Sequence, residues 1–365
     1  MDLTATTTEL ANAAAEAVRL LPGRTLDPVL AGLLLTASDD GVVLSGSDRE
    51  RSVRLTCAAA VHTPGRVLVP AKPLAETLRA LDVPMVRLAV EGARLAVRTP
   101  NARFALPLLD ADLHPGVAEA PPLAGTVDGG QLVTALATVS ATASRDEALP
   151  LFTGVRMRAD GSRLVLAATD RYRMAVASLP WTAITADLDA LIPAGLLAEV
   201  AKQARGQVAV HVDNNRVSLA WGSSVVTTAL LDGSFISESK LVLSQVDTKV
   251  EVAADTLAAA VRRVALYADN RGVLKLEVGD NEIRLRGADQ QAGEAEEAVK
   301  ADVDGGRTSP SFQSRFLIDA LKPFAGQQVR LAIQPGMRAT VFSSPDEEKE
   351  VSLRYMVAPM RPPAG

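Results

Sequence analysis

Residues 164–177 read Leu164-Val165-Leu166-Ala167-Ala168-Thr169-Asp170-Arg171-Tyr172-Arg173-Met174-Ala175-Val176-Ala177. Apolar residues alternate up to Ala168, stop at Thr169-Asp170-Arg171 and resume at Met174, which predicts two strands joined by a short polar turn. Weaker copies of this pattern occupy 41–49 and 281–290. Aligned on Asp48, Asp170 and Asp289, the copies lie 122 and 119 residues apart (170 − 48 and 289 − 170). The spacing predicts three tandem repeats of one structural unit.

Two helical segments recur at nearly the same spacing. The first is Ala-rich and has helical periodicity, with Leu10, Leu132 and Leu257 in matching places of the segments 8–21, 130–144 and 255–268. The second begins within the segments 69–76, 192–199 and 312–319. Alternating strands follow each second helix, so each repeat is predicted to hold two helices against one face of an antiparallel sheet of about eight short strands.

Length and composition fit this organisation. Divided by the repeat, 365 residues give about 122 residues per copy, and each copy is long enough to bury its own core. The predicted fold class is α+β, with three tandem copies of a two-helix, antiparallel-sheet unit and domains at 1–121, 122–246 and 247–365. Hydrophobic residues make up 48% of the chain and aromatic ones only 3%, which indicates a core of Ala, Val and Leu.

Charge and cysteine content exclude several classes of protein. A net charge of -5 argues against a surface that is basic throughout, although it leaves room for a local basic face. The single Cys57 excludes an internal disulfide framework and a multi-cysteine zinc site. No signal peptide and no apolar run of the roughly 18 residues that a membrane span needs is recognised, so we expect a soluble cytoplasmic protein.

The repeats and several motifs together resemble the bacterial sliding clamp, the β subunit of DNA polymerase III. The resemblance covers essentially the whole chain and is carried by the motifs Pro22-Gly23-Arg24, Val69-Pro70-Ala71, Ala168-Thr169-Asp170-Arg171-Tyr172-Arg173-Met174-Ala175, Leu231-Asp232-Gly233 and Tyr355-Met356-Val357-Ala358-Pro359-Met360-Arg361. It implies the DNA clamp fold, in which a head-to-tail homodimer closes into a six-domain ring around duplex DNA. It further implies a nucleoid-associated processivity factor without cofactor or metal, whose partners are double-stranded DNA, the polymerase III catalytic subunit, the clamp loader and other proteins with a clamp-binding motif.

Basic residues at one repeat position agree with a ring that holds DNA. Shifts of 123 and 120 residues superpose Arg79, Lys202 and Lys322 (202 − 79 and 322 − 202). Seven residues earlier, on the same helix face, Lys72 and Arg315 match, with Gly195 as the exception. Such a lining would hold phosphates without reading sequence. The predicted DNA contacts are Arg24, Lys72, Arg79, Arg145, Lys202, Arg205, Arg315 and Lys322. The alternative is that these are ordinary solvated basic residues.

The resemblance also implies a pocket for a short apolar peptide of partner proteins, and a dimer interface. The pocket residues carried over are Phe152, Thr169, Arg171, Tyr172, Arg173, Met174, Ile236, Lys240, Leu241, Val357, Ala358, Pro359, Met360 and Arg361. Met174, Met360 and Leu241 would supply adaptable apolar surface, unless they are plain core residues. At the dimer interface, Phe104 and Leu106 would meet Leu266 and Tyr267 of the neighbour.

Some positions depart from the family pattern. A proline and an aromatic residue are usual where this chain has 236–240, Ala358 replaces a larger apolar residue, and Pro362-Pro363 follows Arg361 in place of a leucine. Ala194-Gly195 and 149–151 lack DNA contacts that are usual in the family. These departures suggest, as an alternative, a specialised clamp paralogue whose altered pocket gives resistance to a clamp-binding antibiotic.

An enzyme is the remaining alternative. His62, His114 and His211 have no nearby cysteine or carboxylate pattern, and no phosphate-binding loop motif occurs. Two carboxylate pairs, Asp110-x-Asp112 and Asp187-x-Asp189, could imitate a two-metal phosphoryl-transfer site, but neither recurs in all repeats. We therefore expect no catalytic activity. The acidic stretches 294–297 and 346–350 are expected to be solvated strand ends or turns.

Overall fold

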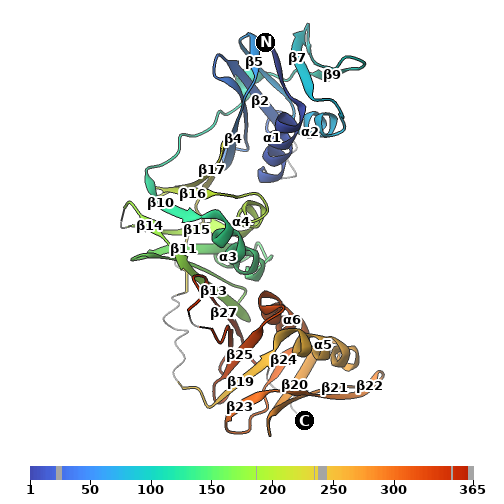
Figure 1. Cartoon of the computed structure of the whole chain (residues 1–365), viewed down its shortest axis with the longest axis vertical. Coiled ribbons are helices and arrows are strands. Elements are labelled where there is room, and N and C mark those ends of the chain that lie inside the picture. The colour runs from blue at the N-terminus through green and yellow to red at the C-terminus, as the bar shows by residue number, and fades with distance from the viewer. Residues whose placement is uncertain (22–26, 186, 234, 237–244, 347, 361–365) are drawn as a thin grey trace. The chain divides into compact units, whose positions relative to one another are not determined.

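The computed structural model describes residues 1–365 except 22–26, 186, 234, 237–244, 347 and 361–365. Its elements recur three times in one order, which is strand, helix, five strands, helix and three strands (Figure 1). Within the described residues each repeat therefore has two α-helices and nine strands, one strand more than expected. The α+β prediction is confirmed.

The bounds of the elements follow the predicted spacing. The first repeat comprises β1 (Asp2–Thr6), α1 (Thr7–Leu20), β2 (Gly32–Ser38), β3 (Gly41–Ser47), β4 (Arg51–Cys57), β5 (Ala60–Thr63), β6 (Gly65–Pro70), α2 (Ala71–Arg79), β7 (Met85–Glu91), β8 (Arg94–Arg98) and β9 (Arg103–Pro107). The second comprises β10 (Leu123–Asp128), α3 (Gly129–Thr142), β11 (Gly154–Asp160), β12 (Arg163–Thr169), β13 (Arg173–Pro180), β14 (Thr182–Ala183), β15 (Asp189–Pro193), α4 (Ala194–Val200), β16 (Gln207–Val212), β17 (Arg216–Trp221) and β18 (Ser224–Ala229). The third comprises β19 (Thr248–Ala253), α5 (Ala254–Val264), β20 (Val273–Gly279), β21 (Glu282–Asp289), β22 (Gly293–Lys300), β23 (Asp302–Gly305), β24 (Ser311–Gln313), α6 (Ser314–Leu321), β25 (Gln328–Ile333), β26 (Thr340–Ser343) and β27 (Ser352–Val357). Short 3-10 turns η1 (Ala111–Leu113), η2 (Pro150–Thr153), η4 (Ala265–Tyr267) and η5 (Lys322–Phe324) lie between them.

The predicted hairpin is present in all three repeats, and an aspartate closes each turn. Asp48, Asp170 and Asp289 each accept, through Oδ1, from the backbone N–H groups two and three residues further on, at 2.6–3.1 Å. Such side-chain bonds stabilise a turn, here together with the backbone bonds from Asp48 to Arg51 and from Asp170 to Arg173. Arg49 and Arg171 follow their aspartates with φ of 83° and 80°, so the first two turns also share a left-handed residue. The repeat in the sequence therefore corresponds to a repeated pair of hydrogen bonds that an aspartate accepts in each turn.

The chain divides into two compact units. The first unit contains 1–133, 181–192 and 196–231. It holds one sheet ordered β5-β1-β7-β8-β9 and a second ordered β14-β10-β16-β17-β18-β4-β3-β2-β6. The second sheet combines strands of two repeats, because β18 pairs antiparallel with β4. Helices α1 and α2 pack against each other in this unit (Figure 1).

The second unit contains 134–180, 193–195 and 232–365. Strands β11-β12-β13-β27-β26-β25-β19-β23 run in that order in one sheet, and a four-stranded sheet has the order β22-β21-β20-β24. Here β13 pairs antiparallel with β27, which again joins two repeats. Helices α5 and α6 lie side by side over the strands (Figure 1). The same junction between repeats is thus built once in each unit.

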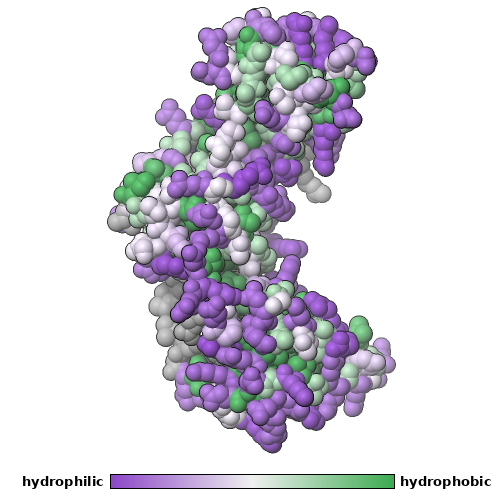
Figure 2. Space-filling model, viewed as in Figure 1, coloured by the Kyte–Doolittle hydropathy of each residue, from purple (hydrophilic) through white to green (hydrophobic). Residues whose placement is uncertain are grey.

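The buried side chains follow the predicted apolar positions. Leu10, Leu132 and Leu257, which occupy matching places in α1, α3 and α5, are each completely buried. Figure 2 shows hydrophilic residues over most of the visible surface of each unit, with hydrophobic residues in small patches. No helix among the described residues is long and apolar enough to cross a membrane.

One expectation about the acidic stretches was wrong. Residues 294–297 lie inside strand β22 and not at a strand end or turn. Glu297 accepts from Arg263 of α5 at 3.0 Å, and Glu296 accepts from Arg284 of β21 at 2.8 Å. These carboxylates occur in a strand because neighbouring arginines compensate their charge.

Candidate partner and DNA-binding sites

The turn between β12 and β13 has a fixed geometry. Thr169 donates its hydroxyl to the carbonyl of Arg173 at 2.7 Å and accepts from the backbone N–H of Arg171 at 3.1 Å. The backbone N–H of Ala358 donates to the carbonyl of Tyr172 at 2.9 Å. The turn is thus held from within by Thr169 and Asp170 and from outside by the segment that follows β27.

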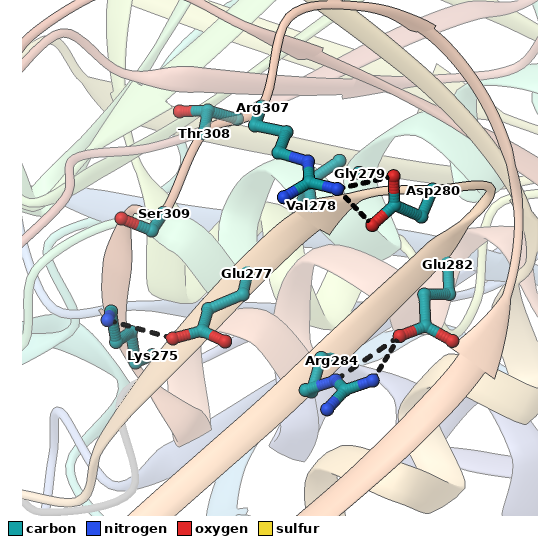
Figure 3. A pocket seen from close by; sticks show the side chains of 10 residues that line it. All are labelled: Lys275, Glu277, Val278, Gly279, Asp280, Glu282, Arg284, Arg307, Thr308 and Ser309. Carbon is teal, nitrogen blue, oxygen red and sulfur yellow. Dashed lines mark hydrogen bonds and ion pairs between the residues drawn. The ribbon is translucent and has the colours of Figure 1, made fainter.

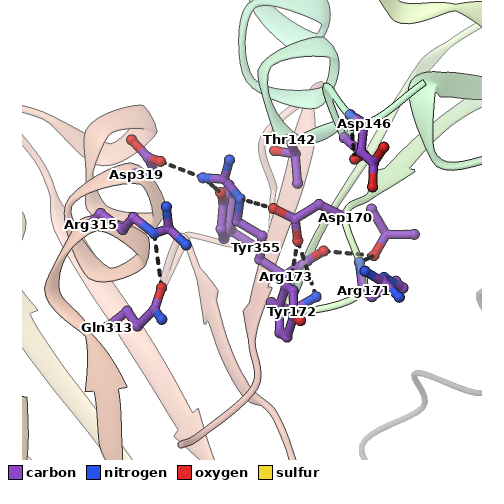
Figure 4. Close-up of polar contacts among 12 residues, drawn as sticks. Thr142, Asp146, Asp170, Arg171, Tyr172, Arg173, Gln313, Arg315, Asp319 and Tyr355 are labelled. Atoms are coloured by element: carbon purple, nitrogen blue, oxygen red, sulfur yellow. Dashed lines mark hydrogen bonds and ion pairs between the residues drawn. The ribbon is translucent and has the colours of Figure 1, made fainter. Parts of the chain in front are cut away.

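A cleft of about 930 Å³ lies beside this turn in the second unit. Its walls come from α3, the turn, α6 and β27 (Figure 4). The α3 wall consists of small side chains, among them Ala137, Thr138 and Ala141. The other side chains that line the cleft are Thr134, Thr142, Ala143, Ser144, Arg145, Asp146, Asp170, Arg171, Tyr172, Arg173, Arg315, Phe316, Asp319, Lys322, Pro323, Leu353 and Tyr355.

Arg173 connects the turn to the third repeat. Its Nε donates to Asp170 at 2.9 Å, and its Nη1 donates to Asp319 and, at 3.1 Å, to the hydroxyl of Tyr355 (Figure 4). The Arg173 side chain is only 13% exposed. Burial acts to lower the pKa of Arg173, but Tyr355, Asp170 and Asp319 outweigh it and hold this pKa above its usual value. We call Arg173, Asp170, Asp319 and Tyr355 the Arg173 network.

Aromatic rings form the apolar part of the cleft. The rings of Tyr172 and Phe316 stack with centroids 6.3 Å apart and an interplanar angle of 17°. Two guanidinium groups lie over Phe316, that of Arg173 at 5.0 Å and that of Arg315 at 4.6 Å from its centroid. Arg171 lies 5.9 Å from the centroid of Phe152 and 5.8 Å from that of Tyr172. Phe316, covered by these groups, is only 5% exposed, whereas Tyr172 is 54% exposed. Tyr172 therefore offers flat apolar surface next to cations, which suits a ligand with both apolar and anionic groups.

The structure distributes the predicted pocket residues over different environments. Arg171, Tyr172 and Arg173 line the cleft, Ile236 is exposed, and Phe152, Ala358, Pro359 and Met360 are half-buried. Met174 is buried in an apolar cluster with Ala167, Ala332, Val341 and Met356, so it offers no free surface to a partner. Thr169 and Val357 are buried as well. Lys240, Leu241 and Arg361 lie outside the described residues.

Phe316, Asp319 and Tyr355 line the cleft and were missed from sequence. They belong to α6 and β27, more than 140 residues after the turn, so no local pattern connects them with it. The sequence held one signal for Phe316. The repeat shifts of 123 and 120 align it with Pro73 and Leu196, so this helix position is aromatic in the third repeat and not in the other two.

The predicted DNA contacts are exposed wherever the structure describes them. Lys72 lies 3.7 Å from Glu76, Lys202 lies 2.7 Å from Glu199, and Arg205 lies 4.0 Å from Glu16. Within the described part of the chain, Arg79, Arg145, Arg315 and Lys322 have no carboxylate at ion-pairing distance, and Arg315 donates to Gln313 at 2.8 Å. Arg145, Arg315 and Lys322 also line the cleft. Arg24 lies outside the described residues.

Comparison with known proteins identifies the family. Models of the DNA polymerase III beta subunit match in three parts, the N-terminal domain at 1–118, the central domain at 126–237 and the C-terminal domain at 241–361. The chain belongs to the bacterial beta sliding clamp family. It is 31% identical to the beta sliding clamp of Streptomyces coelicolor, over 96% of this chain and 97% of that protein. It is 30% identical to the beta sliding clamp homolog GriR of Streptomyces muensis, over 92% of each chain. A solved clamp from Pseudomonas aeruginosa bound to griselimycin has the same fold, with a TM-score of 0.91, 23% identity and coverage of 99% of this chain and 100% of that one.

The predicted dimer residues lie on or beside two strands at sheet edges. Phe104 of β9 is 41% exposed, and Leu266 and Tyr267 of η4, next to β21 and β22, are 75% and 39% exposed. Leu106 lies two residues from Phe104 on the same face of β9, but it is only 8% exposed. The contact of Leu106 with the neighbouring chain stays a prediction, and a single chain leaves little of its surface exposed for it.

The other charged clusters of this clamp are internally compensated. A pocket of about 460 Å³ on the four-stranded sheet is lined by ion pairs between Arg307 and Asp280, Lys275 and Glu277, and Arg284 and Glu282 (Figure 3). No group of three or more possible metal ligands occurs among the described residues.

Several of the carboxylates and all three histidines that were weighed for catalysis have structural partners. Asp110 accepts from the backbone N–H of Asp112 at 2.9 Å, and Asp112 pairs with Arg66 at 3.0 Å. Asp187 and Asp189 are both exposed. The rings of His62, His114 and His211 hydrogen-bond to Thr4, Gly116 and Pro121, respectively. Of these contacts, the exposed one between Thr4 and His62, at 3.0 Å, is the one that places a hydroxyl beside an imidazole.

Proposed function

We propose that two copies of this chain close head to tail into a ring of six repeats that encircles duplex DNA and tethers the replicative polymerase. The pattern of strand pairing between repeats carries this proposal. Strands β9, β18 and β27 hold the same place in their repeats, as do β4, β13 and β22. Inside the chain β18 pairs with β4 and β27 pairs with β13. The strands left over are β9 and β22, each at a sheet edge.

An unpaired edge strand exposes backbone donors and acceptors and invites pairing with another chain. If β9 of one copy pairs with β22 of the next, the junction already present twice in the chain is repeated between chains. Such a contact is heterologous, and it closes when the rotation per repeat completes a circle. Closure by two chains follows the family likeness.

Side chains around the two edges support this pairing. Phe104 on β9 and Leu266 and Tyr267 beside β22 are exposed apolar groups of the kind that a subunit interface covers. On the β8–β9 edge Arg98 and Arg103 pair with Glu91, and on β22 Glu296 and Glu297 pair with arginines. Among the described residues, Arg94 of β8 and Glu294 of β22 have no partner of opposite charge at ion-pairing distance. Opposite charges on the two edges favour contact between unlike edges over contact between like ones.

The DNA contacts proposed are Lys72, Arg79, Arg145, Lys202, Arg205, Arg315 and Lys322, together with Arg24. Exposure supports the described members, and recurrence at matching repeat positions supports five of them, namely Arg79, Lys202 and Lys322 at one position and Lys72 and Arg315 at another. Contacts to phosphates alone are independent of base sequence and weaken with salt, so a ring held by them can slide. The chain would consist of clamp domains at 1–121, 122–246 and 247–365, and the three family-model matches at 1–118, 126–237 and 241–361 support their number and order.

In this proposal the cleft beside Arg171 and Tyr172 receives an apolar peptide of the polymerase III catalytic subunit, the clamp loader and other partners. The half-buried Phe152, Ala358, Pro359 and Met360 and the exposed Ile236 would widen the contact surface. The protein would act in the cytoplasm at the nucleoid as a binding protein and not as an enzyme.

Retention on DNA of defined topology tests the ring. A clamp loaded on nicked circular DNA should stay bound during gel filtration in moderate salt and leave after the circle is linearised. Leu266→Arg should lower the dimer fraction in native mass spectrometry and abolish this retention. Met337→Arg, which changes another exposed apolar residue of the same unit, 49% exposed, serves as control. A monomeric wild-type protein, or equal retention on linear DNA, would refute the ring. A nuclease assay with Mg²⁺ or Mn²⁺ tests the enzyme alternative.

A second candidate function is that of a specialised clamp resistant to a clamp-binding antibiotic. The likeness to the homolog GriR supports it, as does the departure of 236–240 and Ala358 from the family pattern. Griselimycin, the compound bound to the solved Pseudomonas aeruginosa clamp, is a suitable probe. Calorimetric titration should give a weaker affinity for this protein than for the Streptomyces coelicolor clamp. Equal affinities would remove this candidate.

A further inference from the structure

The cleft of the second unit has an excess of uncompensated positive charge. Within the described residues, Arg145, Arg171, Arg315 and Lys322 line it without a carboxylate at ion-pairing distance. Of the three aspartates in the lining, Asp170 and Asp319 are bound by Arg173. The whole chain carries a net charge of -5, so this excess is local.

Arg171 brings its charge directly to the aromatic surface. It is exposed, and its guanidinium lies within 6 Å of the ring centroids of Phe152 and Tyr172. The repeat-equivalent Arg49 in the first unit has nearly the same backbone, with φ of 83° against 80°. The left-handed turn residue is therefore a property of the repeat, whereas the contact with two aromatic rings distinguishes the second unit.

We propose that the cleft selects partner segments in which acidic side chains flank the apolar anchor. This inference rests on the proposed function, because it specifies the peptide that the cleft receives. The anchor packs on the exposed ring of Tyr172, and a flanking carboxylate reaches Arg171, which is not among the proposed DNA contacts. A guanidinium binds a carboxylate through two parallel hydrogen bonds while its face remains on a ring, so both contacts form together.

A single-stranded nucleic acid offers bases and phosphates to the same groups, but it fits the cleft less well. Its charge is continuous, whereas the cations of the cleft alternate with Asp146, Asp170 and Asp319. Asp146 is exposed and, among the described residues, has no cation at ion-pairing distance. A peptide can place an uncharged residue beside Asp146, whereas a phosphate backbone would bring a negative charge there.

Fluorescence anisotropy with three labelled nonapeptides tests the proposal. All share a Leu-Leu-Phe anchor and differ in one Asp, Asn or Lys residue on each side of it. In 50 mM NaCl we expect the Asp peptide to bind about five-fold more tightly than the Asn peptide, and the Lys peptide to bind most weakly. At 500 mM NaCl the difference should nearly vanish, because surface charges are then screened over a few ångströms.

Two matched variants assign the effect to the cleft. Arg171→Gln should reduce the five-fold preference for Asp over Asn to about two-fold or less. Arg49→Gln, at the equivalent turn position in the first unit, should leave it unchanged. If the Asp and Asn peptides bind equally in low salt, the inference fails and the peptide cleft of the proposed function stands. If no peptide binds, the cleft of the proposed function fails.

An unlabelled thymidine 12-mer distinguishes the other occupant. It should displace the Asp peptide only at concentrations well above the dissociation constant of that peptide. Displacement by the 12-mer at lower concentrations than by unlabelled Asp peptide, lost in Arg171→Gln, would assign the cleft to single-stranded DNA and overturn the proposal.

Discussion

The two units contain the same junction between consecutive repeats, but the side chains at the two junctions differ, and the second junction has a cleft of about 930 Å³. In the first unit, α1 faces residues 196–205, and in the second, α3 faces α6 and η5. A shift of 122 residues aligns Glu16 and Arg19 of α1 with Thr138 and Ala141 of α3. Arg19 donates to Gln203 at 3.3 Å, and Glu16 lies 4.0 Å from Arg205, so long side chains bridge the first junction. The short side chains of Thr138 and Ala141 line the cleft at the second junction. Side-chain length at two helix positions thus separates a junction that side chains bridge from one that holds a cleft.

The arginine that ends the turn differs between the junctions as well. Arg173 binds Asp170, Asp319 and Tyr355, whereas the equivalent Arg51 donates to the carbonyl of Leu20 at 3.1 Å. Strand register aligns Tyr355 with Val226, which has no hydroxyl. Glu199, the equivalent of Asp319, pairs with Lys202. One backbone plan therefore supports a polar network only where the cleft is open.

The largest effect is expected from Arg173→Ala. It leaves Asp170, Asp319 and the buried Tyr355 hydroxyl without their shared donor, which should lower the free energy of unfolding of the second unit by about 2–3 kcal/mol. Hydrogen exchange of β13 and β27, followed by mass spectrometry in urea, measures this. Tryptophan fluorescence should hardly change, because Trp181 and Trp221 both belong to the first unit.

Arg51→Ala is the matched control for that variant. The substitution removes one hydrogen bond from Arg51 to a carbonyl. We therefore expect the free energy of unfolding of the first unit to fall by about 1 kcal/mol. Burial lowers the pKa of Arg51 from its usual value, against the opposing effect of Asp48, Glu50 and Glu199, which agrees with a less favourable environment. If Arg173→Ala and Arg51→Ala lower the free energy of unfolding of their units by the same amount, the Arg173 network has no special role.

A double substitution should close the open junction. Thr138→Glu with Ala141→Arg introduces the side chains of the first junction into the α3 wall of the cleft. We expect at least a tenfold loss of affinity for the Leu-Leu-Phe peptide, about 1.4 kcal/mol, because the new side chains occupy the space of the anchor. Anisotropy of the labelled peptide gives the affinity. The reciprocal change, Glu16→Thr with Arg19→Ala, should leave it unaltered, and a loss there would contradict the assignment of the peptide to the second unit.

The fold was predictable because its signals are local. An aspartate at a fixed place in each repeat closes each hairpin turn, and leucines at helical spacing are buried in α1, α3 and α5. The pairing of β18 with β4 and of β13 with β27 was not predicted. Pairing between repeats depends on which strands lie at the ends of each sheet, and no local pattern records that.

The cleft was predictable only in part, for a related reason. Arg171, Tyr172 and Arg173 lie in the turn that defines the repeat, so the resemblance identified them. Met174, carried over with them, points into the core, since a strand alternates its side chains between two faces and both faces are covered here. Asp319 and Tyr355 join the site only through the β13–β27 pairing. The Arg173 network can therefore be predicted only when the β13–β27 pairing is known.

Glu16→Thr alone should change stability little. The carboxylate of Glu16 is buried, and its Oε1 has no hydrogen-bond partner among the described residues. Removing an incompletely paired buried charge offsets the packing that is lost, so the free energy of unfolding of the first unit should change by less than about 1 kcal/mol. Urea titration followed by tryptophan fluorescence measures it. A loss above about 2 kcal/mol would mean that the Glu16–Arg205 contact holds the junction together.

The smallest effect expected is a pH dependence confined to the first unit, which contains all three histidines. Burial, assisted by Arg66, lowers the pKa of His114, whose Nδ1 accepts from the backbone N–H of Gly116 at 3.1 Å. The unfolded chain then binds a proton more readily than the folded one. Stability is therefore complete above the unfolded pKa of about 6.5 and falls as the pH decreases below it. Urea titrations between pH 7.5 and 5.5 should show this decline in tryptophan fluorescence, and His114→Asn, which keeps an acceptor near Gly116, should flatten it. An equal loss of stability in the second unit, measured as lost protection of β13 and β27 from hydrogen exchange, would contradict this prediction. The second unit has no histidine to titrate in this range.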